Sequence, residues 1–135
     1  MSLRSRHTTP PTLEEIEALA EAAYATVPEE LRNRIDNLVI RVEKFPDEET
    51  EREMGLESPY ELLGLYRGVD LSRRSVLDPP RGPDMVFLYR GPLLDYWCET
   101  GEDFAHLVRH VLIHEIGHHF GLSDAAMDAI EQNAR

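Results

Sequence analysis

Residues 104–124 read FAHLVRHVLIHEIGHHFGLSD and decide the fold of this chain. Apolar residues recur there at intervals of three and four, which is the period of one face of an α-helix. Thr100 with Asp103 offers a helix cap, and Gly121 offers a stop, because glycine readily adopts the left-handed conformation that ends many helices. The sequence therefore predicts a helix over about residues 102–119. The residues expected on its buried side are Phe104, Leu107, Val108, Val111, Leu112, Ile116 and Phe120.

Two histidines and a glutamate on this helix have the spacing of a metal site. His114 and His118 are four residues apart, so they share one face and lie about 6 Å apart along the axis. Two imidazoles at that spacing can each reach one ion at roughly 2.0–2.1 Å. Glu115 is rotated by about 100° from His114, so its carboxylate can border a metal-activated water without binding the metal.

A third ligand is expected just after the helix, because a catalytic zinc takes three protein ligands and keeps one position open. Gly121 lets the chain fold back, and Asp124 follows three residues later with a carboxylate. We therefore expect one Zn²⁺ per chain, bound by His114, His118 and Asp124; such a set also accepts Co²⁺ or Mn²⁺. One alternative stays open, because Ser123 and Asp124 also suit the start of a final helix.

The rest of the chain predicts an α+β domain. Thr12 and Glu15 form a capping box, which predicts a helix to about Val27, and a short helix follows Pro28. A last helix is expected near residues 123–132. Strands are predicted at 38–45, 60–69 and 84–90, with Gly64 as a candidate bulge and a proline-rich loop at 72–83. This order of helix, strands and helices is typical of one small sheet with helices packed on it.

Length and charge limit the classes of function. The 135 residues fit a flexible arm at 1–11 and a single domain at 12–135. The net charge of −12 argues against nucleic acid or an anionic membrane as a partner, and no apolar run is long enough to span a bilayer. The lone Cys98 and the lack of a signal-like stretch favour a cytoplasmic protein. The acidic block at 46–58 is expected to be a solvated loop with a helical turn rather than a site for a basic partner.

The extended motif HExxHxxGxxD resembles the zinc motif of metzincin-type metallopeptidases, in the version with Asp as third ligand. Residues 89–92 (YRGP) and 108–124 together are similar to a family of short bacterial zincin-like proteins described as candidate zinc metallopeptidases. The resemblance implies a minimal zincin-like domain, with a mixed sheet of about three to four strands packed on an N-terminal helix and the HExxH helix, and a short C-terminal helix. It implies zinc ligands at His114, His118 and Asp124, and Glu115 as general base in peptide-bond hydrolysis.

Several neighbouring residues have two interpretations. His110 either contacts a metal ligand or is buried against the sheet; ligation by His110 and His114 is disfavoured, because no glutamate follows His110. His119 either contacts substrate or is simply exposed. Tyr89 and Tyr96 are candidates to stabilise an oxyanion.

The expected substrate is a peptide or an unstructured protein segment. If residues 84–90 form an edge strand, that strand can pair with an extended peptide; otherwise it is an ordinary core strand. The alternative function is a non-catalytic zinc-binding interaction domain. The oligomeric state is left open.

Overall fold

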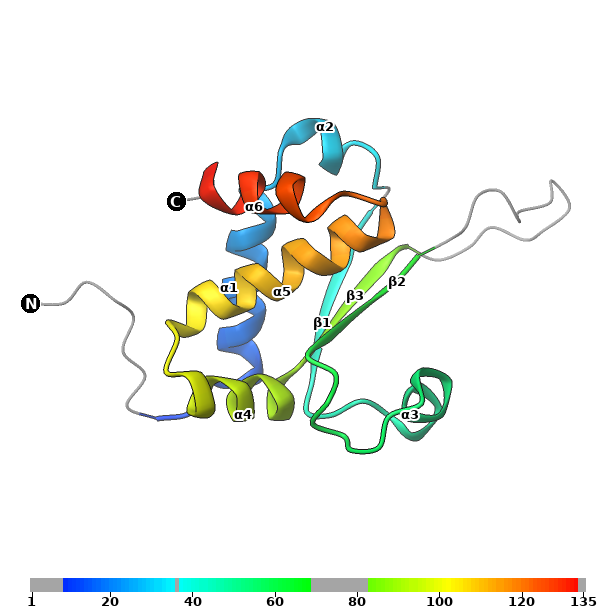
Figure 1. Ribbon diagram of the computed structural model, residues 1–135, viewed down its shortest axis with the longest axis vertical. Helices are drawn as coiled ribbons and strands as arrows, with labels where there is room; N and C mark the ends of the chain where they lie inside the picture. The colour runs from blue at the N-terminus through cyan, green and yellow to red at the C-terminus, as the bar shows by residue number, and fades with distance from the viewer. Residues whose placement is uncertain (1–8, 36, 69–82, 134–135) are drawn as a thin grey trace, which may run out of the picture.

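Helix α5, Phe104–His119, runs through the middle of the molecule and contacts helices α1, α4 and α6 and strands β2 and β3 (Figure 1). The structure, a computed structural model, describes residues 9–35, 37–68 and 83–133. The order of helices and strands confirms the α+β class. The other elements are α1 (Leu13–Ala25), α2 (Glu29–Arg32), β1 (Val39–Glu43), α3 (Glu48–Met54), β2 (Gly64–Arg67), β3 (Met85–Tyr89), α4 (Arg90–Thr100) and α6 (Asp124–Asn133).

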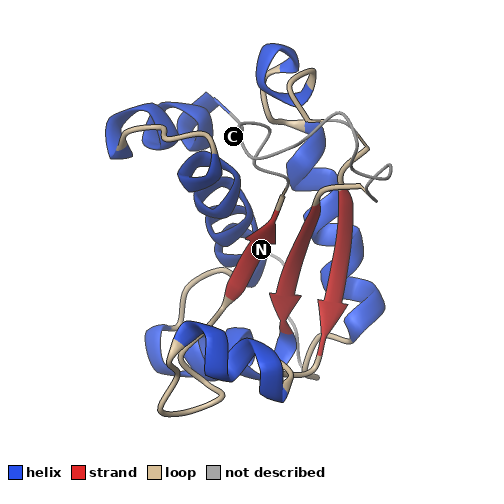
Figure 2. Cartoon of the chain, turned by 90° about the vertical axis from the view of Figure 1, so that its right-hand side faces the viewer, coloured by secondary structure: helices blue, strands red, loops and turns tan. Residues whose placement is uncertain are grey.

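The three described strands form one mixed sheet in the order β1-β3-β2 (Figure 2). Strand β1 runs parallel to β3, with Val39 opposite Met85, whereas β2 is antiparallel to it, with Gly64 opposite Leu88. Because β3 lies in the middle, the edge-strand interpretation of residues 84–90 is wrong and the core-strand interpretation is confirmed. Gly64 pairs in regular register, so the predicted bulge is also wrong.

One face of the sheet carries the hydrophobic core. Ile40, Val86 and Leu88 point to this face, because side chains alternate along a strand, and all three are buried with residues of α1 and α5. Gly64 lies against α5, because a Cβ atom on this residue would stand 2.9 Å from Val111 Cγ1. Burying one large apolar side chain stabilises a fold by roughly 1.5–3 kcal/mol, so this core fixes the position of α5 relative to the sheet.

The ends of the main helices follow the predicted signals. Thr12 and Glu15 form both hydrogen bonds of the capping box at the start of α1. At the start of α5 the Asp103 carboxylate accepts a hydrogen bond from the backbone N–H of His106 at 3.0 Å. Gly121, with φ of 72°, ends the helix, and the N–H groups that follow bond back to carbonyls of its last turn. This reversal directs α6 back along α5.

Three predictions about the elements need correction. The acidic block contains a real helix, α3, which begins at the N-cap Asp47 and ends at Gly55 in the left-handed conformation. Residues 90–100 form helix α4, which the sequence interpretation lacked. Strand β2 is shorter than the predicted 60–69.

Parts of the predicted chain lie outside the described residues, namely most of the arm at 1–11 and nearly all of the loop at 72–83. Pro11, at the end of the arm, is buried, and its carbonyl accepts a hydrogen bond from Arg90 Nε at 2.6 Å. Among the described helices, none is long and apolar enough to cross a membrane.

Candidate metal centre

His114 lies at the centre of a row of histidines on α5. Its ring centroid is 4.1 Å from that of His110 and 5.7 Å from that of His118, whose ring is nearly perpendicular to it. The Nε2 atom of His114 is buried, and it has no hydrogen-bond partner among the described residues. A buried imidazole nitrogen without a hydrogen-bond partner is costly unless something binds it, so this atom fits a metal ligand.

The surroundings of His114 favour the neutral imidazole that metal binding requires. Burial is the main cause that lowers its pKa, followed by the neighbouring His110. The charges of the Glu131 and Asp124 carboxylates oppose this shift. Neutral imidazole nitrogens and carboxylate oxygens are the donors that zinc prefers in catalytic sites, so the residues present fit the metal.

Asp124 is the first residue of α6, directly after the turn at Gly121. Ser123 accepts a hydrogen bond from the N–H of Ala126 through its Oγ at 3.1 Å, which confirms the predicted helix start. His118 and Asp124 are both exposed. Zinc ligation by Asp124 remains a prediction.

Glu115 faces strand β2. Its Oε1 accepts a hydrogen bond from the backbone N–H of Tyr66 at 3.2 Å. Burial raises the pKa of Glu115, while this hydrogen bond and the charge of His118 oppose the shift. A carboxylate with a raised pKa that lies one residue from a metal-ligand candidate has the properties of a general base.

Tyr66 is the aromatic residue beside this site, and the sequence interpretation did not select it. Its ring stacks on that of His119, with centroids 4.0 Å apart and planes 14° apart. Its hydroxyl donates a hydrogen bond to Asp84 Oδ2 at 2.6 Å. Burial and this bond raise the pKa of the phenol, so the Tyr66 hydroxyl stays protonated and keeps its hydrogen bond to Asp84. Nothing in the local sequence distinguishes it from the other tyrosines.

The comparison with protein families decides the identity of this domain. The model of the family described as zincin-like metallopeptidase matches residues 35–134. The chain belongs to the zincin-like metallopeptidase family. A solved structure of a conserved hypothetical protein from Thermus thermophilus is similar, with a TM-score of 0.52 and 24% identity over 82% of this chain and 94% of that one. This likeness shows the fold alone. No curated protein matches the chain.

This zincin-like domain contains a second cluster of metal-ligand donors. His110 Nδ1 lies 2.7 Å from Glu131 Oε1, and His114 Nε2 lies 3.9 Å from Glu131 Oε2. One ligand atom from each of the three residues lies within 4.8 Å of the others. The sequence interpretation did not select Glu131, because it lies outside the HExxHxxGxxD motif and reaches His110 only where α6 runs back along α5.

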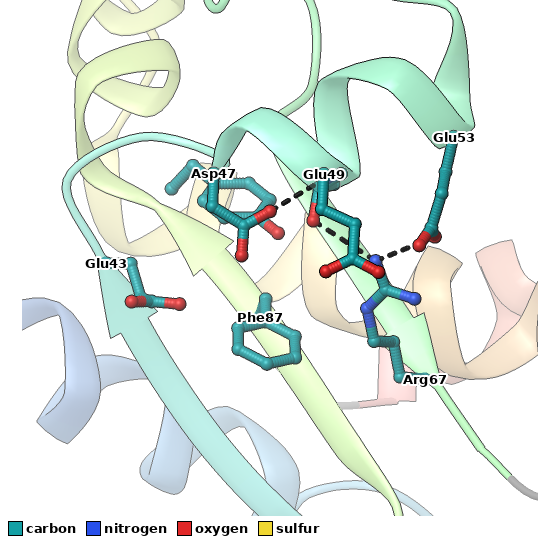
Figure 3. Close-up of a pocket in the computed structure, with 8 residues that line it drawn as sticks. Glu43, Asp47, Glu49, Glu53, Arg67 and Phe87 are labelled. Atoms are coloured by element: carbon teal, nitrogen blue, oxygen red, sulfur yellow. Dashed lines mark hydrogen bonds and ion pairs between the residues drawn. The ribbon is translucent and has the colours of Figure 1, made fainter.

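Tyr89 lies elsewhere in the zincin-like domain. It lines a pocket of about 240 Å³ under α3, together with acidic side chains (Figure 3). Arg67 in this pocket donates hydrogen bonds to Thr50 Oγ1 and Glu53 Oε2, each at 3.1 Å. Phe87 also lines it, and side-chain alternation places Phe87 on the opposite face of β3 from the buried Val86 and Leu88. The structure therefore does not bring Tyr89 together with the histidines of α5, and Tyr96 is exposed on α4.

Proposed function

We propose that this protein is a zinc-dependent metallopeptidase in which His114, His118 and Asp124 bind the metal and Glu115 is the general base. One observation carries this proposal. The unpartnered, buried Nε2 of His114 lies one residue from a carboxylate whose pKa is raised by burial. Membership of the zincin-like metallopeptidase family supports the choice of zinc and of peptide hydrolysis.

The roles of the protein groups follow from their positions. When bound, zinc supplies a Lewis acid that polarises the scissile carbonyl and makes water more acidic. Glu115 accepts the proton of the attacking water on its carboxylate and then delivers it to the leaving amine. The N–H of Tyr66 donates a hydrogen bond to Oε1 of Glu115, so it keeps the carboxylate directed toward β2 and limits its rotation.

The proposed substrate is an extended peptide or an unstructured protein segment that runs beside β2. This strand is an edge of the described sheet and contacts α5. An edge strand offers backbone groups to an extended chain, and a β2-bound peptide would pass next to Glu115. β2 thus takes the role that the sequence interpretation gave to residues 84–90.

The test is cleavage of a quenched-fluorescence peptide library by zinc-loaded protein. Wild type and the control Glu17→Gln, an exposed change on α1, should cleave the same peptides, and a chelator should abolish cleavage. Glu115→Gln should keep its zinc and lose about 10²–10⁴-fold in rate. Undiminished cleavage by Glu115→Gln would contradict the base assignment, and zinc binding without any cleavage by wild type would favour a non-catalytic zinc-binding interaction domain.

A further inference from the structure

We propose that His110, His114 and Glu131 form a second position for a divalent cation, which shares His114 with the proposed peptidase ligands. The inference rests on the proposed function only for the identity of that first ligand set. The second position would hold Zn²⁺ or Co²⁺, because two imidazole nitrogens and one carboxylate are the donors that these ions accept.

The spacing of the donor atoms supports this position. In tetrahedral zinc sites with bonds of roughly 2.0–2.2 Å, the ligand atoms lie about 3.3–3.6 Å from one another. Glu131 Oε1 lies 2.7 Å from His110 Nδ1 and Glu131 Oε2 lies 3.9 Å from His114 Nε2, so each oxygen of this carboxylate has one histidine near this distance. One ligand atom of each residue lies within 4.8 Å of the others, so the three groups converge on one position.

Glu131 is unusual because it is a buried carboxylate. Its side chain is 11% exposed, and its two oxygens face two different histidines. Met127, one turn earlier on α6 and fully buried, packs on Gly117 of α5, where a Cβ would overlap its Sδ and Cγ atoms. This close contact between the helices holds Glu131 over the row of histidines. Removing a carboxylate from water costs free energy, and binding of a cation offsets this cost.

The shared histidine makes the two positions mutually exclusive. His114 Nε2 has one lone pair, so it binds one ion at a time. A chain therefore takes one zinc, in one position or the other, and the ratio between them depends on the two affinities and not on the zinc concentration. Glu115 is held at β2 by Tyr66, whereas Glu131 comes from α6. An ion between His110 and Glu131 thus lacks the general base, so a chain with its zinc in this second position is catalytically inactive.

Zinc stoichiometry of purified, zinc-saturated and dialysed variants tests the proposal, measured by elemental mass spectrometry. We expect about one zinc per chain in wild type, His110→Ala and His118→Ala, because each single change leaves one position intact. His114→Ala and the double variant His110→Ala/His118→Ala should retain none. His106→Ala is the matched control on the same helix, since His106 bonds to Arg109 and belongs to neither set; it should behave as wild type.

A near-isosteric change keeps the test valid if alanine variants unfold. In the His118→Ala background, Glu131→Gln should weaken Co²⁺ binding, followed by visible absorbance, by more than about tenfold. If His118→Ala holds no metal while His110→Ala does, the second position is refuted and the proposed function stands. If His118→Ala keeps its zinc and His110→Ala loses it, the second position is supported and the proposed peptidase ligand set is contradicted.

Discussion

The backbone N–H of Tyr66 donates a hydrogen bond to Glu115 Oε1 at 3.2 Å, which ties the edge strand β2 to the histidine-bearing helix α5. The residues are 49 positions apart along the chain. The contact sets the direction of the proposed general base and holds β2 beside the helix that carries the proposed metal ligands. Its effect on zinc binding and its effect on the rate of cleavage can be measured separately.

Glu115→Asp should uncouple zinc binding from catalysis. The shorter side chain withdraws the carboxylate by one methylene and loses the Tyr66 hydrogen bond, while His114 and His118 are unchanged. We expect zinc content equal to that of wild type and a fall in kcat of about 10–100-fold, because a displacement of about 1 Å is enough to lower the rate this much. Wild-type kcat in this variant, measured on a cleaved library peptide, would show that the position of the carboxylate is unimportant.

Gly64→Ala should destabilise the fold. The new methyl group would stand 2.9 Å from Val111 Cγ1 and 3.0 Å from the Phe87 carbonyl oxygen, so β2 must shift away from α5. Overpacking of this kind costs about 1–3 kcal/mol of unfolding free energy, which urea denaturation measures. Val111→Ala removes the Cγ1 atom that the methyl group meets, so the double variant should lose less than the sum of the single changes. Strictly additive losses of unfolding free energy would show that the new methyl group does not clash with Val111.

Thr12→Ala should weaken the start of α1. The change removes the hydroxyl that accepts the Glu15 N–H at 3.1 Å and so breaks the capping box. A loss of about 1 kcal/mol in unfolding free energy is expected. Thr9→Ala, at an exposed position before the helix, is the control and should stay within about 0.5 kcal/mol of wild type. Equal stabilities of the two variants would contradict a stabilising role for the cap.

Tyr89→Phe should change the stability of the protein at alkaline pH. Burial raises the pKa of Tyr89 from 10.0 to about 12. Between these values the folded protein keeps the phenol proton that the unfolded chain loses, so the free energy of unfolding falls as the pH rises through this window. This loss reaches about 1.4 kcal/mol at pH 11, one unit above the unfolded pKa, and it should be absent from Tyr89→Phe. Denaturation at pH 8, 10 and 11 measures the difference, and parallel pH dependences would refute it.

The sequence was sufficient for the parts of the fold that local signals control. Helix α5 and its stop at Gly121 follow from apolar periodicity and a glycine, and the start of α1 follows from its capping box. Helix α4 was missed because Gly91 and Pro92 are typical of a turn. Proline is nevertheless tolerated in the first turn of a helix, where its missing N–H has no intrahelical partner. The N–H of Gly91, in the same first turn, donates a hydrogen bond to the Lys44 carbonyl.

The site was predictable only where its residues share one helix. The spacing of His114, Glu115 and His118 is a local pattern, so the sequence contains it. Tyr66 and Glu131 reach the same helix from β2 and α6, and their approach depends on the packing of the whole domain. No periodicity or motif records such long-range contacts, and the order of the strands is hidden for the same reason.

The central claim is that the histidine row of α5 binds zinc, and the zinc content of purified wild type and His114→Ala tests it most directly. After saturation and dialysis, elemental mass spectrometry should find about one zinc per chain in wild type and none in a folded His114→Ala variant, because both proposed ligand sets need this residue. Wild type without zinc, or His114→Ala with a full equivalent of zinc, would contradict the account.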